Sequence, residues 1–204
     1  VGPFHDLNHP IPADHDDYFD YLAASGRKGA PVIFPLESSR GCTWNQCRFC
    51  VYSEGQQNRK KAPELLRDEI LFLIQKYQAR YFAFMDNDIA CNDPERLEKI
   101  LDDLAAIRRS HGTQMMAEIV PKNLGATLLK KLARAGFHQI HFGYESLSEA
   151  LLRKMRKKHR FSDNIFFIKF ARKYQIKLPS ANIITGIIGE EDADILECMD
   201  NLHF

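Results

Sequence analysis

The amino-acid sequence predicts an α/β fold, in which a parallel sheet is flanked by helices. A short apolar run, a polar turn and a stretch with helical periodicity follow one another five times along the chain. The 204 residues are 45% hydrophobic and 27% charged, which is typical of a globular protein with one sizeable core. Such units either close into a barrel or open into a doubly wound sheet, and the periodicity does not choose between them.

The first 25 residues are expected to form a linker and a short helix that would join the core to an upstream domain. Residues Val1 to Asp16 are rich in Pro, His and Asp and have no apolar period, so they indicate an extended segment. Tyr18 to Ala24 then has the pattern of a short amphipathic helix. Residues 26–204 are expected to form the core.

Five apolar runs are expected to be the strands of the sheet. They are Val32–Leu36, Tyr81–Met85, Met115–Val120, Gln139–Gly143 and Ile176–Thr185. The expected helices are Pro63–Gln75, Pro94–Arg109, Asn123–Ala135, Ser148–Lys158, Ser162–Tyr174 and one that begins near Asp192. Proline suits a first helical position, Asn123 is a plausible cap, and Gly136 is a stop signal.

Polar residues follow each run, and the carboxyl ends of parallel strands meet at one rim, where ligands gather. These residues are Cys42 and its neighbours, Asp86 and Asn87, Glu118, Glu145 and Ser146, and residues 185–190. The sequence therefore predicts one binding site at that rim.

The stretch from Glu37 to Tyr52 places three thiols, those of Cys42, Cys47 and Cys50, within nine residues. A closed zinc site and a cluster that only carries electrons each take four protein ligands. A cubane held by three cysteines leaves one iron open to a substrate or cofactor. A zinc site completed by a distant histidine remains an alternative, and Cys91 and Cys198 are interpreted as lone buried thiols.

The formal net charge of +1 argues against bulk attraction to nucleic acid or to a membrane surface. No stretch approaches the length of a transmembrane helix, and no basic segment precedes an apolar one at the N-terminus. A cytoplasmic location is expected, where thiols stay reduced and clustered cysteines bind metal.

The cysteine loop resembles that of radical S-adenosylmethionine (SAM) enzymes, which carry C-x3-C-x2-C with an aromatic residue before the last cysteine. Phe49 occupies the aromatic position, but four residues separate Cys42 from Cys47, so the extra residue is expected to bulge outward. The resemblance implies a [4Fe–4S] cluster that binds SAM at its open iron. It also implies a partial (β/α)6 barrel, of which this chain holds about five units and ends before the sixth strand.

Further segments extend the resemblance to the cofactor site. Asn182 to Glu190, with Gly186, Ile187 and Ile188, resembles the fifth-strand motif that flanks the adenine. Gly143 to Ser146, followed by Lys157, resembles the fourth-strand segment near the ribose and the methionine carboxylate. The resemblance thus implies a set of cofactor-binding residues: Phe49, Asp86, Asn87, Glu118, Glu145, Ser146, Lys157, Gly186, Ile187 and Ile188. The family's Gly-Gly-Glu, which receives the methionine amine, is replaced by Met85 to Asp88.

Taken together, these motifs resemble the branch whose members carry a cobalamin-binding domain upstream, including maturases of ribosomally made peptides. This implies modification of an unactivated position, with methylation as one candidate, in a peptide or small-molecule substrate. It also implies cobalamin supplied through an upstream domain, and an electron donor such as flavodoxin or ferredoxin. Two other functions stay open, a zinc-binding interaction module and a simple iron–sulfur electron-transfer protein.

Overall fold

The computed structural model describes residues 6–8, 12–51, 57–122, 124–180 and 182–203. Its main sheet has four parallel strands in the order β1 (Ile33–Leu36), β4 (Tyr81–Phe84), β5 (Gln114–Glu118) and β6 (Phe137–His141). Each strand adds to the same edge of the sheet as the chain proceeds, which is the order of successive right-handed βα units. The predicted parallel α/β fold is therefore confirmed.

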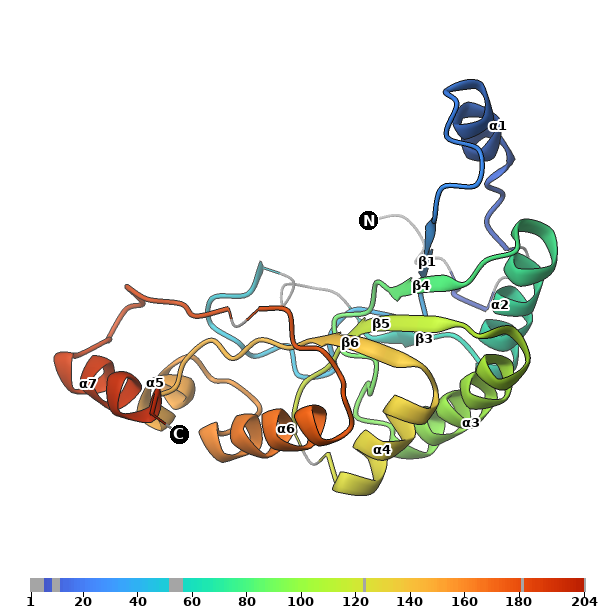
Figure 1. Cartoon of the computed structure of the whole chain (residues 1–204). Coiled ribbons are helices and arrows are strands. Elements are labelled where there is room, and N and C mark those ends of the chain that lie inside the picture. Colours follow the sequence, from blue (N-terminus) through green and yellow to red (C-terminus); the bar gives the residue numbers. More distant parts are fainter. Residues whose placement is uncertain (1–5, 9–11, 52–56, 123, 181, 204) are drawn as a thin grey trace.

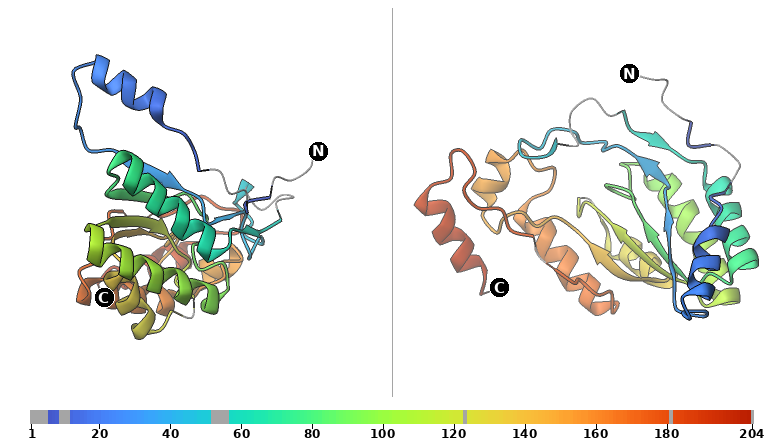
Figure 2. Two further views of the ribbon diagram at one scale, coloured as in Figure 1. Left: turned by 90° about the vertical axis from the view of Figure 1, so that its right-hand side faces the viewer. Right: turned by 90° about the horizontal axis from the view of Figure 1, so that it is seen from above.

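Helices cover one face of this sheet. They are α2 (Pro63–Tyr77), α3 (Pro94–His111), α4 (Ala126–Arg134) and α6 (Phe161–Lys173), and they follow the curve of the sheet, whose opposite face carries no helix (Figures 1 and 2). The short helix α5 (Glu149–Lys154) and α7 (Asp192–Asn201) lie beyond the β6 end. The barrel is not closed, so the arrangement is that of a partial barrel.

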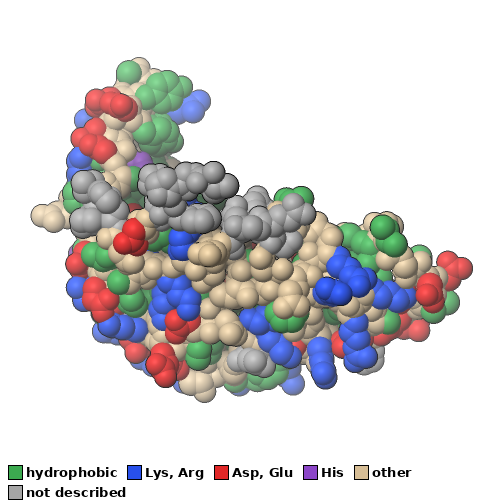
Figure 3. Space-filling view, turned by 180° about the vertical axis from the view of Figure 1, so that it is seen from behind, with side chains coloured by type: hydrophobic (Ala, Val, Ile, Leu, Met, Phe, Trp, Pro, Cys, Tyr) green, Lys and Arg blue, Asp and Glu red, His purple; other side chains and the backbone are tan. Residues whose placement is uncertain are grey.

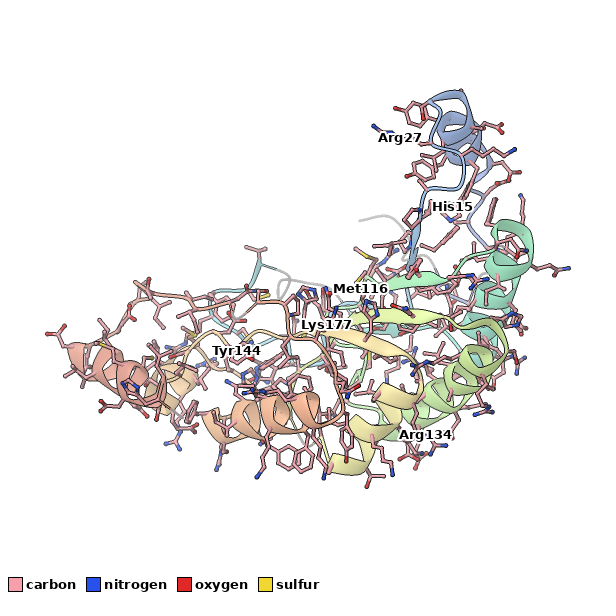
Figure 4. The ribbon with its side chains drawn as sticks, in the orientation of Figure 1. His15, Arg27, Met116, Arg134, Tyr144 and Lys177 are labelled. Atoms are coloured by element: carbon pink, nitrogen blue, oxygen red, sulfur yellow. The ribbon has the colours of Figure 1, made fainter. Side chains whose placement is uncertain are left out.

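Alternation along each strand separates the two faces of the sheet. Phe34, Phe82, Met115 and Ile140 are buried against the helices and form the core. Figure 4 shows Met116 on the concave, helix-free side and Arg134 on the outer side. Glu118 and His141, the last residues of β5 and β6, lie at the predicted rim of the sheet.

The helix α1 (Asp16–Ala24) stands apart from the sheet beside the β1 end (Figure 1). Its Phe19 ring stacks on Tyr77, with centroids 4.9 Å apart, and the Tyr77 hydroxyl donates to Asp16 at 2.8 Å. The predicted short helix thus forms, and it is attached to the end of α2.

Two short strands that the sequence did not predict close the base of the cysteine loop. They are β2 (Ser39–Arg40) and β3 (Arg59–Lys60), and they pair antiparallel. The Arg96 guanidinium in α3 donates to the carbonyls of Ser38 and Lys61 at 2.6 and 3.1 Å. This bond set fixes both ends of the loop to the helix layer.

The fifth strand, predicted over Ile176–Thr185, does not form as a continuous strand. Its described residues form only two isolated bridges, Gln139 with Lys177 and Glu145 with Ile183. Pro179 lies between them and has no N–H for a ladder, so a continuous strand is interrupted there.

Two helix boundaries also differ from the prediction. The stretch Ser148–Lys158 is helical only over Glu149–Lys154, because Arg156 takes a left-handed conformation with φ of 55°. The helix expected from Asn123 begins at Ala126 with Gly125 as its cap, and Asn123 itself lies outside the described residues.

The surface seen from behind carries Lys and Arg side chains interspersed with Asp and Glu (Figure 3). This mixture agrees with the formal net charge of +1. Among the described residues, none of the helices has the length and apolar character needed to cross a bilayer.

Candidate cluster and cofactor site

A cavity of about 220 Å³ lies at the carboxyl ends of β5 and β6, beneath the cysteine loop. The three residues Cys42, Cys47 and Cys50 line it, and all three are free thiols. Burial raises the pKa of Cys47, with Cys42 and Cys50 adding to the shift and Lys157 opposing it. The three cysteines thus share one cavity, as ligands of a common centre must.

Gly41 sets the direction of the chain into this loop. It has φ of +86°, and a Cβ at this position would lie 2.9 Å from the Gln57 carbonyl oxygen. Both facts require glycine, because other residues rarely adopt this conformation and no space remains for a side chain. The turn brings Cys42 from the β2–β3 pair onto the cavity wall.

Asp86 fastens the residues that lead into the loop. It is 2% exposed, and its carboxylate accepts bonds from the Ser38 N–H at 3.0 Å and from the Ser38 and Ser39 hydroxyls at 2.6 Å. Asp88 is also buried and accepts from the Val120 N–H at 3.2 Å. The Asp-Asn-Asp turn after β4 thus braces its neighbours on both sides, β1 and β5.

The extra residue of the loop bulges outward, as expected. Asn45 has φ of 51°, and both Asn45 and Gln46 are exposed. The preceding Trp44 lines the cavity, and its indole N–H donates to the Arg156 carbonyl at 2.7 Å. The Arg48 N–H donates to the Met155 carbonyl at 3.0 Å, so the loop is docked on the turn after α5.

That same turn places a cation beside the thiols. Lys157 forms an ion pair with Glu145, with Nζ and Oε1 3.1 Å apart and both side chains only 11–12% exposed. Its ammonium also lies 5.6 Å from the centroid of the Phe49 ring. A Cβ on Gly143 would come within 2.0 Å of the Glu145 Oε1, so glycine leaves the room that the carboxylate occupies.

The cavity lining also includes Asn87, Glu118 and His141. Glu118 and His141 are register partners on β5 and β6. Desolvation raises the pKa of Glu118, Glu145 acts in the same direction, and His141 and Lys157 oppose it. The Gln139 amide lies 2.9 Å from His141 Nε2 and orients the imidazole.

Most predicted site residues therefore line one cavity, namely the three cysteines, Phe49, Asn87, Glu118, Glu145 and Lys157. Five do not. Asp86 is buried under its serine partners, and Ser146 is fully buried with its hydroxyl 3.2 Å from Cys198 Sγ. Gly186, Ile187 and Ile188 lie outside the lining, and the Ile188 side chain is fully exposed.

Sequence reasoning missed two histidines of the lining, His141 and His159. His141 alternates with Gln139 and Gly143 along a predicted strand, so a period of two would have placed it on the concave face. His159 lies in a basic run, and nothing in the local pattern distinguishes it from a solvated residue.

The donor set suits a cluster with an open iron. Three free thiols are the ligands that iron–sulfur clusters take, and Lys157 with Glu145 supplies charge for a bound zwitterion beside them. Among the described residues, no three His, Cys, Asp or Glu side chains converge closely enough to hold a single metal ion. Ligands of a polynuclear cluster bind separate irons and stand further apart.

Comparison with known proteins identifies the class of this site. Residues 36–202 match the model of the Radical SAM superfamily, so the chain belongs to that family. The family uses a [4Fe–4S] cluster and SAM, the two cofactors that the cysteine loop predicts.

Among curated relatives, the chain is 27% identical over 176 residues to cytidylyl-2-hydroxyethylphosphonate methyltransferase of Streptomyces wedmorensis, covering 82% of this chain and 32% of the relative. It is also 27% identical over 203 residues to a tRNA-2-methylthio-N(6)-dimethylallyladenosine synthase of Acidithiobacillus ferrooxidans, covering 91% and 44%. The chain thus spans less than half the length of these relatives.

Two solved structures show a similar fold. The cobalamin-dependent SAM radical enzyme OxsB, with aqua-cobalamin and SAM bound, has a TM-score of 0.79 at 18% identity, with 100% of this chain and 30% of that one covered. The radical SAM methyltransferase TsrM of Kitasatospora setae has a TM-score of 0.74 at 15% identity, with 98% and 38% covered.

Proposed function

We propose that the chain is the cofactor-binding part of a radical SAM enzyme that modifies, and in particular methylates, an unactivated position of its substrate. The observation that supports this most directly is the shared cavity of Cys42, Cys47 and Cys50 with the Lys157–Glu145 pair. The three thiolates would hold the cluster, whose open iron would bind SAM for reductive cleavage or methyl donation.

The residues of the chain bind and orient the cofactor. Lys157 would receive the methionine carboxylate. Its ammonium is only 11% exposed, and a charge-assisted hydrogen bond to a carboxylate is stronger there than in open solvent. Glu145 would then accept from the ribose hydroxyls. Phe49 and Trp44 lie on the cavity wall and limit access of water to the thiols.

Asn87 and Glu118 face the same space and are proposed as further cofactor contacts. The predictions for Asp86, Ser146, Gly186, Ile187 and Ile188 stay predictions. The structure gives Asp86 and Ser146 buried hydrogen-bond partners instead, so a contact there would require those bonds to open.

The finer assignments extend this proposal to the whole protein. A ribosomally made peptide is the proposed substrate class, with cobalamin bound by a domain outside this chain and flavodoxin or ferredoxin as electron donor. Support for cobalamin comes from the likeness to OxsB and TsrM, whose structures contain it. Support for the peptide comes from the motifs alone.

Anaerobic reconstitution with iron and sulfide tests the cluster. We expect about four irons per chain, a brown protein and, after reduction by dithionite, cleavage of SAM to 5′-deoxyadenosine and methionine. Cys198→Ala should behave like the wild type, whereas Cys47→Ala should retain almost no iron. One bound zinc in a colourless protein would favour the interaction module, and a full cluster without affinity for SAM would favour electron transfer.

A further inference from the structure

A basic stretch runs from the end of α5 into the turn that follows it and adjoins the cysteine loop. Residues 153–160 hold six Lys or Arg side chains and no Asp or Glu. On the face seen from behind, Lys and Arg side chains gather toward the end of the molecule that carries α5 and α7 (Figure 3). Exposed cations are ordinarily solvated, so their number alone indicates no partner.

Three cations of this stretch are paired with carboxylates of the chain itself. The pairs are Arg153 with Glu149, Lys154 with Asp194 and Lys157 with Glu145. By contrast, the guanidinium groups of Arg48 and Arg156 are exposed and form no ion pair or hydrogen bond within the part of the chain that the structure describes. Their charges are therefore available to a partner.

These two cations lie beside each other on the outside of the cysteine loop. The Arg48 N–H donates to the carbonyl of Met155, the residue before Arg156, at 3.0 Å. Arg48 stands in the sequence between Cys47 and Cys50, but unlike them it does not line the cavity. A molecule seated on this outer surface is thus one or two residues away from the thiols that the proposed function assigns to the cluster.

An apolar side chain completes this surface. Val51 follows Cys50 directly and is 80% exposed. Cations around an exposed apolar side chain suit a transient protein interface, in which charge steers the encounter and an apolar contact completes it. We call the surface formed by Arg48, Val51 and Arg156 the loop face.

We propose that the loop face is the docking site of an acidic protein that donates single electrons, of the flavodoxin or ferredoxin class. This rests on the proposed function, because reductive cleavage consumes one electron for each SAM. With flavodoxin, the electron leaves the anionic flavin hydroquinone, which becomes the neutral semiquinone, and is taken up by the oxidised cluster, so no proton has to move. A nucleic acid fits less well, because it is bound along a longer basic track and the formal net charge of the chain is only +1.

Reduction of the reconstituted protein by two different reductants tests the docking site. Stopped-flow absorption would follow the cluster as it is reduced by flavodoxin hydroquinone or by dithionite, a small molecule that needs no docking surface. At low salt, Arg48→Glu and Arg156→Glu should each slow reduction by flavodoxin about tenfold and leave reduction by dithionite within about twofold, because repulsion replaces attraction only at the docking site. Salt at about 500 mM should slow the wild type toward the variants, because it screens exposed charges.

Calorimetry with oxidised flavodoxin supplies a readout without electron transfer, and its affinity should fall about tenfold in the same two variants. Arg48→Gln removes the charge without reversing it and should lie between Arg48→Glu and the wild type. Arg134→Glu is the matched control. Arg134 is exposed on α4, on the outer side of the sheet (Figure 4), so its reversal should change neither the rate nor the affinity.

Three outcomes would overturn the docking site. They are equal slowing with both reductants, unchanged reduction by flavodoxin in both variants, and a wild type that dithionite reduces but flavodoxin does not. Binding of tRNA that the two substitutions weaken, while reduction by flavodoxin stays unchanged, would assign the loop face to a nucleic acid instead. If flavodoxin reduces the wild-type cluster but SAM is neither bound nor cleaved, the docking site stands and the proposed function fails.

Discussion

Replacement of Asp86 by alanine should destabilise the fold rather than the cofactor contact alone. Burial raises the pKa of Asp86, and the bonds from Ser38 and Ser39 offset this only in part. Burial therefore penalises the charge of this carboxylate, while the three donors around it stabilise that charge. What the site needs from residue 86 is acceptor oxygens in the right place more than a negative charge.

The magnitude follows from the three bonds that are lost. Hydrogen bonds to a charged group are worth about 1.5–3 kcal/mol each, which sets a ceiling of about 9 kcal/mol for three. Relief of the buried charge and rotation of the two hydroxyls return about half, so we expect about 3–5 kcal/mol for Asp86→Ala. Asp86→Asn keeps one acceptor and removes the charge, and should cost only about 1–2 kcal/mol.

Thermal and urea unfolding of the chain, followed by circular dichroism, would measure this. At about 2–4 °C per kcal/mol, Asp86→Ala should lower the melting temperature by about 6–20 °C. Asp68 is an exposed aspartate paired with its neighbour Arg67, so Asp68→Ala should stay within about 0.5 kcal/mol of wild type. If Asp86→Ala melts with the wild type and instead loses affinity for SAM, Asp86 is a cofactor ligand and the brace is wrong.

Three further predictions concern the loop and its neighbours. Cys42→Ala, Cys47→Ala and Cys50→Ala should each lose most of the iron after reconstitution, whereas Cys91→Ala should keep it; iron loss in Cys91→Ala would mean a fourth protein ligand. Folding lowers the pKa of His159 from 6.5 to about 4. Between these pH values the unfolded chain protonates this histidine and the folded chain does not, so stability is lost as the pH falls through that window. Between pH 7 and pH 5 this amounts to about 2 kcal/mol, seen as a shift of the urea midpoint that His159→Leu should lack; an equal shift in both proteins would contradict it. Trp44→Phe removes one donor to the Arg156 carbonyl, should cost about 1 kcal/mol, and should speed loss of iron to a chelator; an unchanged rate would separate Trp44 from cluster retention.

The parts of the fold that sequence predicted are those set by local pattern. Four apolar runs became β1, β4, β5 and β6, because alternation alone decides which side chains meet the helix layer. The fifth run was also predicted as a strand, but Pro179 interrupts its ladder, and no further described strand pairs beyond it. The strand propensity of a segment is a local property, so it does not show whether a neighbouring strand is available for pairing.

The candidate site shows the same division. The cysteines could be assigned from spacing, and Lys157 and Glu145 from a motif, since each of these features is contiguous. The burial of Asp86 depends on serines 47 and 48 residues away, and no pattern near Asp86 indicates them. The bracing of the loop by Asp86 is thus a structural role that the sequence did not predict.

The bulged cysteine loop and the early end of α5 meet at one pair of hydrogen bonds. A bulge at Asn45 turns Trp44 and Arg48 toward the turn after α5, where they donate to the carbonyls of Arg156 and Met155. These two carbonyls are free to accept bonds from the loop because the helix has already ended there. Arg156 takes a left-handed conformation at this point. Had the helix continued to Lys158, Lys157 would follow the helical path instead of turning toward Glu145 and the thiols. The additional residue in the loop thus accompanies the break that places the cation and His159 on the cavity wall.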